Sequence, residues 1–229
     1  MSGFFLVKIE MRTTLLLSLF CLLFVASCET QETESQNEKY VHIPPELPDS
    51  VFSMVQAGDI ILRKGNGPLS FHLMHHTKEN YSHCGIIVEH EGKKKIIHTI
   101  GGSASEDDVD GIQFEEISKF VAHAADSMLF ICRPVFKDSA GPAIADAAFK
   151  YLEQEVPFDH SFSLYTPDKL YCSELLYYIF KDVNGKNLFD VQKKHKSYML
   201  MFSTFFDTSK FEPVFHLCPD EDRWYTLSE

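Results

Sequence analysis

The stretch SHCGII, residues 82–87, and the stretch LYCSELL, residues 170–176, decide how this chain is interpreted. In the first, His83 stands directly before small and apolar residues that predict a buried strand. In the second, Cys172 begins a segment that is almost continuously apolar and predicts a central helix. A cysteine at the start of a helix, with a histidine nearby, has the surroundings that convert a thiol into a nucleophilic thiolate.

Cys172 is the candidate nucleophile. A helix that begins there directs free backbone N–H groups and a partial positive charge at the sulfur, which favours the thiolate. The N–H of Cys172 can also donate to an oxyanion. On residue type alone, a buried cysteine without chemical function is the commoner case, so the interpretation depends on the partner histidine.

His83 is the candidate base, and His98 is the candidate group that orients it. Residues 94–100 predict a second strand, and the turn at Glu91-Gly92 predicts a hairpin that brings His98 close to His83. A base of this kind needs a third polar group to fix its tautomer. We expect His98 to be that group, with Glu89 as the alternative that the sequence leaves open.

The remaining pattern predicts a single α+β domain. Strands gather in the middle of the chain, and segments with helical spacing lie on either side of them. Residues 156–168 predict a loop rich in aromatic side chains. The predicted helices are 48–56, 69–77, 115–122, 141–153 and 172–180, and the further predicted strands are 60–63, 112–114 and 128–133.

With the stretches GDII at 58–61, IIHT at 96–99 and PFD at 157–159, the chain resembles the permuted papain-fold cysteine hydrolases, the YiiX-like branch of the NlpC-like superfamily. As in that group, the histidine precedes the cysteine along the chain. The resemblance implies a circularly permuted papain-like fold, with a central antiparallel sheet or small barrel packed against helices. It also implies a Cys172–His83 dyad completed by a polar residue from the next strand.

His98 departs from the glutamate that is usual at the third position of YiiX-like proteins and is similar to the histidine of the lecithin:retinol acyltransferase-like group. Hydrolysis and acyl transfer therefore both stay open. We expect attack on an amide or ester bond, in a cell-wall peptide or a lipid acyl group, through a thioester on Cys172. Phe158, Tyr165 and Tyr171 are the expected substrate contacts. The opposing hypothesis is a non-catalytic ligand-binding lipoprotein that uses the same cleft.

The first 27 residues predict a lipoprotein signal peptide. Two basic residues precede an apolar run at 14–26, which is too short for an ordinary membrane span. The tetrapeptide VASC at 25–28 resembles the lipobox of bacterial lipoproteins, which implies lipidation of Cys28 and anchoring to a membrane of the bacterial cell envelope. Residues 28–44 predict a flexible tether, and residues 45–229 the catalytic domain.

A net charge of −12 opposes binding to nucleic acid, whose phosphates would be repelled. We therefore expect a small-molecule, peptide or lipid substrate as partner. His72 and His76 are spaced as two ligands on one helical face, but no third ligand stands at a zinc-site spacing. The sequence accordingly predicts no metal and no other cofactor.

Overall fold

A computed structural model describes residues 46–102, 110–135, 140–166, 168–194 and 197–218. The chain divides into two units, Met1–His42 and Ile43–Glu229, and all of the described residues belong to the second. The predicted signal peptide at 1–27, the tether at 28–44 and Cys28 lie outside the described residues, so those assignments stay predictions.

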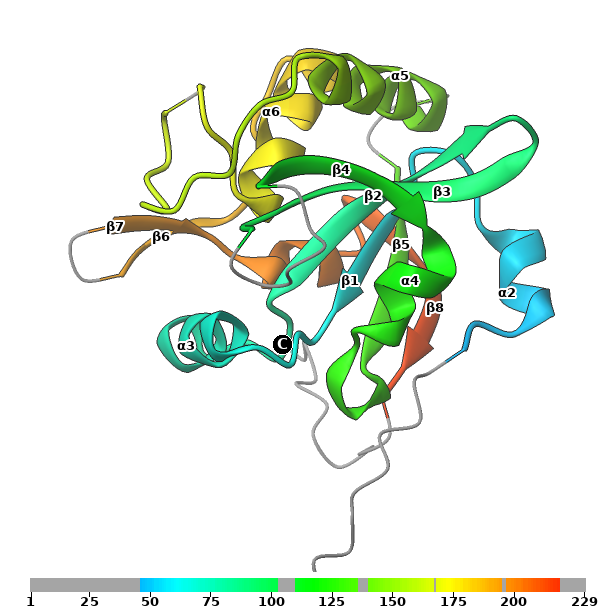
Figure 1. The fold of residues 1–229 in the computed structure, drawn as a ribbon, viewed down its shortest axis with the longest axis horizontal. Helices are drawn as coiled ribbons and strands as arrows, with labels where there is room; N and C mark the ends of the chain where they lie inside the picture. Colours follow the sequence, from blue (N-terminus) through cyan, green and yellow to red (C-terminus); the bar gives the residue numbers. More distant parts are fainter. Residues whose placement is uncertain (1–45, 103–109, 136–139, 167, 195–196, 219–229) are drawn as a thin grey trace, which may run out of the picture. The chain divides into compact units, whose positions relative to one another are not determined.

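A six-stranded sheet with the order β4-β3-β2-β1-β5-β8 forms the centre of the described unit, and all of its pairs are antiparallel. β2 and β3 form the predicted hairpin, with Ile86 opposite Ile97. Figure 1 shows the twisted sheet between two layers of helices. The strands are β1 Ile60–Arg63, β2 His83–His90, β3 Lys93–Ile100, β4 Gly111–Glu116, β5 Leu129–Pro134 and β8 Phe211–Leu217.

The sheet is open, so the central antiparallel sheet is confirmed and the small barrel that the sequence also allowed is wrong. Closure would require β4 and β8 to pair, yet within the described residues β4 pairs only with β3 and β8 only with β5. Six strands that retain their natural twist can be covered by helices on both faces, and burial then does not depend on closing the sheet.

Alternate residues of the strands face two separate cores, because side chains along a strand point to opposite faces. Ile60 and Ile86 belong to one core, which contains the long helices α5 (Ala140–Glu153) and α6 (Cys172–Asn184). Ile61 and Ile87 belong to the other, which contains α2 (Asp49–Met54) and α4 (Ile117–Ala122). The central strands are buried on both faces, which explains their unbroken apolar runs.

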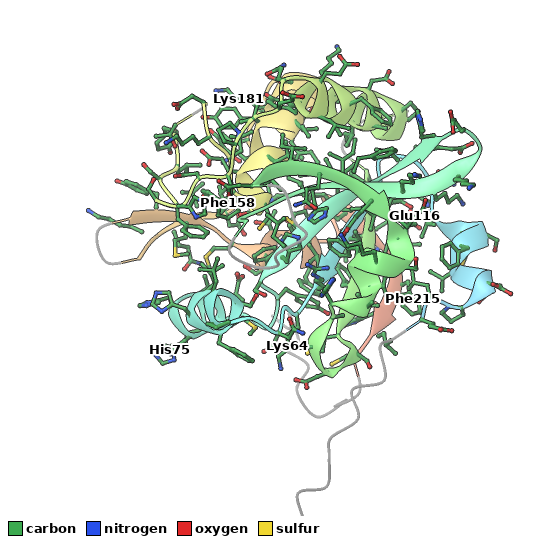
Figure 2. The ribbon with its side chains drawn as sticks, viewed as in Figure 1. Lys64, His75, Glu116, Phe158, Lys181 and Phe215 are labelled. Carbon is green, nitrogen blue, oxygen red and sulfur yellow. The ribbon has the colours of Figure 1, made fainter. Side chains whose placement is uncertain are left out.

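α3 (Pro68–Thr77) buries only Thr77. It extends outward beside the lower ends of β1 and β2, and Figure 2 shows His75 on its outer side. The remaining elements are the hairpin of β6 (Val191–Lys194) and β7 (Ser197–Leu200) and the short 3-10 helices η1 (Ala125–Ser127) and η2 (Phe202–Phe206). In the part of the chain that is described, no helix combines the length and the apolar character needed to cross a bilayer.

Glu115 is the instructive error of the sequence interpretation. It was predicted to begin a helix, but β4 continues through Glu116 and α4 begins at Ile117. Gln113 pairs with His98 across the sheet, so Glu115 lies two residues further along the neighbouring strand and on the same face as Gln113. With the predicted boundary, the carboxylate of Glu115 would lie on a solvent-facing helix. With the boundary that the structure has, it lies at the predicted site.

Candidate active site

Cys172 is the first residue of α6, as predicted. Tyr171 precedes the helix in extended conformation and provides no side-chain cap, so the first N–H groups of α6 remain available near the sulfur. The thiol is buried and its Sγ lies 3.9 Å from the backbone oxygen of Ser82, to which it donates a weak hydrogen bond. The start of α6 is thereby held against the start of β2.

His83 is the first residue of β2 and lines, together with Cys172, a cavity of about 370 Å³. Its Nε2 lies 2.8 Å from Nδ1 of His98 on the neighbouring strand, and both rings are buried. Gly85 permits this approach, because a Cβ atom there would lie 2.6 Å from Cγ2 of Ile96 and 3.1 Å from Cβ of His98. The glycine of the SHCGII stretch therefore has a packing role.

Glu115 extends this line of polar groups, and the sequence interpretation missed it. Its Oε1 lies 3.0 Å from Nε2 of His98, and its Oε2 lies 3.4 Å from Nζ of Lys119. The side chain is 9% exposed, which is rare for a glutamate without a partner. The sequence could have indicated Glu115 only if the predicted strand at 112–114 had been extended to cover residues 111–116.

The line Glu115–His98–His83 assigns the tautomers of both rings. A carboxylate accepts hydrogen bonds, so His98 carries its proton on Nε2 and leaves Nδ1 as an acceptor. His83 must then donate from Nε2 to that acceptor. Its Nδ1 is consequently unprotonated and is the nitrogen that can take a proton from the thiol of Cys172.

Phe120 of α4 holds the imidazoles and one cation in place. The ring of His83 stacks on it at 5.3 Å, and the ring of His98 meets its edge at the same centroid distance. The guanidinium of Arg63 lies 4.3 Å from the Phe120 centroid, and its Nη1 donates to the Phe120 backbone oxygen at 2.5 Å. Arg63 also lines the cavity at Cys172, so a positive charge is fixed beside the reactive groups.

The pKa of the Cys172 thiol is lowered from its usual value, in the direction that favours a nucleophile. The main cause is a hydrogen bond from the thiol of Cys84, and burial acts against it. Backbone N–H groups of Cys84 and Ser173 and the charge of Arg63 lower the pKa further. The pKa values of Cys84 and Cys132 are raised well above the usual value, chiefly by burial, so these two thiols stay protonated.

The pKa of His83 is lowered well below 6.5, first by burial and then by electrostatic interactions, of which that with the charge of Arg63 is the largest. His83 is therefore a neutral base at neutral pH. Burial tends to raise the pKa of Glu115, but the hydrogen bond and electrostatic interaction with His98, followed by the charges of Lys119 and Arg63, bring it below its usual value. Glu115 is thus ionised and can accept from His98.

The three predicted substrate contacts lie in different surroundings. Phe158, which belongs to the aromatic loop, lines the cavity at Cys172. Tyr171 is buried beside a smaller neighbouring cavity. Tyr165 is 60% exposed and is not among the residues that line either cavity. Phe162, another aromatic residue of the same loop, lines both cavities.

Glu89 and Glu174 are not part of the line Glu115–His98–His83. Glu89 is exposed at the far end of β2, opposite Lys94, and so is separated from His83 by most of the strand. Glu174 is fully buried, and its Oε1 accepts the backbone N–H of Tyr165 at 3.2 Å. Burial is the main cause that raises its pKa to about 8. Its contact supports a structural role in fixing the aromatic loop.

His72 and His76 lie close together on α3, with ring centroids 4.2 Å apart. Across the described residues, no group of three or more His, Cys, Asp or Glu side chains could hold a metal ion.

Comparison with known proteins identifies the family of this chain. A family profile described as a permuted papain-like amidase enzyme, YaeF/YiiX, C92 family, matches residues 54–203. The uncharacterized protein YiiX of Escherichia coli strain K12 is 26% identical over 140 residues, which are 60% of this chain and 63% of that relative. The match thus spans less than two thirds of the relative's length.

A solved structure shows the same fold. It is described as the metalloprotein YiiX from Escherichia coli O157:H7, and the similarity covers 72% of this chain and 99% of that chain with a TM-score of 0.61. The identity is 20%, so this likeness concerns the fold alone.

The hydrogen bond between the two thiols gives a first prediction. Cys84→Ala removes the main contribution to the lowered pKa of Cys172, so alkylation of Cys172 by iodoacetamide at pH 7 should slow by roughly tenfold. Peptide mass spectrometry identifies the labelled residue. Cys132→Ala is the matched control, because Cys132 is equally buried on β5 but is not a cause of the Cys172 shift. Equal rates in the two variants would contradict the assignment.

Glu115 gives a second prediction. Glu115→Gln keeps the shape but offers His98 an amide that can also donate, so the tautomers of both rings are no longer fixed. Alkylation of Cys172 should slow by roughly tenfold, with an altered pH profile and an unchanged fold by circular dichroism. Glu116→Gln is the control, because Glu116 is exposed and pairs with Lys95. An unaffected Glu115→Gln protein would remove Glu115 from the site.

Proposed function

The chain belongs to the C92 family of permuted papain-like amidases, and from this premise we propose that it cleaves an amide or ester bond by forming a thioester on Cys172. The family supports a cysteine hydrolase type of function. The observation that carries the proposal is the line Glu115–His98–His83, which ends at the cavity that also contains the thiol.

The proposed first step forms the acyl-enzyme. Nδ1 of His83 takes the proton of the Cys172 thiol while Sγ attacks the substrate carbonyl carbon, so an S–C bond forms. The N–H groups at the start of α6 donate to the oxyanion that develops. His83 then returns its proton to the leaving amine or alcohol as the C–N or C–O bond breaks, and the acyl group stays on sulfur.

The proposed second step releases the acyl group. Water attacks the thioester while His83 takes one of its protons, and the thiol is regenerated with that proton as the carboxylic acid leaves. An alcohol or amine in place of water would give acyl transfer instead. His98 favours neither outcome by itself, because its Nδ1 only needs to accept from His83 for both reactions.

Trapping the thioester tests the proposal. Mixing the protein with the p-nitrophenyl ester of butyric acid should give a butyryl adduct on Cys172 by intact-protein and peptide mass spectrometry. His98→Ala should slow adduct formation by roughly ten- to ten-thousandfold, since the orientation of His83 is lost. His90→Ala is the control, because His90 lies on the neighbouring strand β2 and is exposed.

The opposing hypothesis of a non-catalytic binding protein makes a different prediction for the same experiment. A protein of that kind needs no activated cysteine, so no adduct would accumulate on Cys172 and His98→Ala would change nothing. An adduct on Cys218 instead of Cys172 would also contradict the proposal.

A further inference from the structure

Cys84 is a second buried thiol beside the nucleophile, and the proposed mechanism gives it no covalent role. It follows His83 on β2, and neighbouring residues of a strand point to opposite faces of the sheet. The ring of His83 stacks on Phe120, which belongs to the core of α2 and α4. Cys84 is fully buried in the other core, which also contains Cys172. The thiol of Cys84 therefore lies on the face of the sheet that α6 covers.

Two hydrogen bonds from Cys84 reach the sulfur of Cys172. The thiol of Cys84 donates one of them, and its backbone N–H donates the other. The same Sγ of Cys172 lies 3.9 Å from the backbone oxygen of Ser82. These contacts hold the two sulfur atoms at hydrogen-bond distance. A disulfide bond is about 2 Å long, so the sulfur atoms need to approach by roughly another 2 Å to form one.

Cys132 is as deeply buried as Cys84 but lies elsewhere in the sheet. It belongs to β5, and β1 lies between β5 and β2. Strands separated by one other strand are about 10 Å apart. The Cα atoms of a disulfide lie less than about 7 Å apart. The sheet therefore prevents a disulfide between Cys84 and Cys132, and the thiol in contact with Cys84 is that of Cys172.

Access from solvent distinguishes the two sulfur atoms of the pair. Cys172 lines the cavity of about 370 Å³ and a neighbouring space of about 30 Å³, whereas Cys84 lines neither of these two. The larger cavity easily admits a molecule as small as hydrogen peroxide. An accessible cysteine in an environment that favours the thiolate is the type that peroxide oxidises. Peroxide should therefore react at Cys172, and Cys84 can react only with the oxidised sulfur.

We infer that Cys84 and Cys172 form a reversible redox pair, in which hydrogen peroxide oxidises Cys172 and Cys84 then closes a disulfide with it. In the first step the sulfur of Cys172 attacks one peroxide oxygen and the O–O bond breaks. The sulfur becomes a sulfenic acid, and the leaving hydroxide takes up the proton released by the thiol. In the second step the sulfur of Cys84 attacks the sulfur of Cys172, so an S–S bond forms and the S–O bond breaks. The hydroxyl group leaves as water with the proton of Cys84.

The disulfide would both protect the nucleophile and stop its chemistry, which goes beyond the proposed function. Further peroxide converts a sulfenic acid into a sulfinic acid, which dithiols do not reduce. Closure of the disulfide consumes the sulfenic acid before that step. A dithiol restores both thiols by exchange and is itself oxidised to a disulfide. The oxidised protein has no thiol at Cys172, so it forms no thioester until it is reduced.

Disulfide mapping tests the inference directly. The reduced full chain is treated with hydrogen peroxide, and the remaining thiols are blocked with iodoacetamide under denaturing conditions. Peptides from a digest without reductant are then identified by mass spectrometry. The expected product is an intramolecular disulfide that joins the peptides of Cys84 and Cys172, with the loss of two hydrogen atoms from the protein mass. Dithiothreitol should restore both thiols.

Two matched cysteine variants identify the thiol that closes the disulfide. Cys84→Ala removes it, and Cys132→Ala is the control because Cys132 is equally buried. At equal loss of the free Cys172 thiol, dimedone should trap the sulfenic acid in Cys84→Ala with roughly tenfold higher yield than in the control. The control should form the disulfide as the wild-type protein does. Circular dichroism shows whether both variants fold. If Cys84→Ala does not, the wild-type disulfide map decides the question.

The outcomes separate the inference from the proposed function. Absence of the Cys84–Cys172 disulfide overturns the inference, whether Cys172 stays reduced, becomes a sulfinic acid or pairs with another cysteine. Equal trapping by dimedone in the two folded variants overturns it as well. If the disulfide forms but the reduced protein gives no butyryl adduct on Cys172, the proposed function fails and the redox pair stands. If the adduct forms and the disulfide does not, the proposed function stands and the redox pair fails.

Discussion

The hydrogen-bond line from Glu115 through His98 to His83 is the constraint on which the account of this site depends. A histidine base acts only if the correct nitrogen carries the lone pair, and a buried ring cannot rely on water to choose it. Here the ionised carboxylate of Glu115 on β4 fixes the tautomer of His98, and His98 on β3 fixes the tautomer of His83. His98 stands where YiiX-like proteins usually have a glutamate. It can still orient His83, because Glu115 on the next strand fixes the tautomer of His98.

The fold supplies the partners of this line from distant parts of the chain. Three adjacent strands carry His83, His98 and Glu115, and antiparallel pairing fixes their order across the sheet. α6 covers the opposite face and brings Cys172 to the start of β2, while Phe120 of α4 packs on both imidazoles. Because both faces of the sheet are buried, the charged form of His83 is poorly solvated and the charge of Arg63 is weakly screened, and both effects lower the pKa of His83.

The sequence predicted those elements whose pattern lies within a short segment of the chain. His83, His98 and Cys172 stand in short apolar segments whose ends are marked by a turn or a helix start, so their elements were predicted correctly. Glu115 lies where a strand passes directly into a helix, and local pattern does not separate the two. β8 pairs with β5 across a long separation in sequence, and its mixture of polar and aromatic residues has no clear period, so this edge of the sheet was missed.

The protonation state of His83 is the most direct test of the central claim. Nitrogen-15 chemical shifts of its ring, assigned by comparison with His83→Gln protein and followed from pH 8 to pH 5, report which nitrogen carries the proton and where the ring titrates. The account predicts a neutral ring protonated on Nε2, with a pKa below the ordinary 6.5 because of burial and the charge of Arg63. A ring protonated on Nδ1 at neutral pH, or one that titrates at or above 6.5, would contradict it.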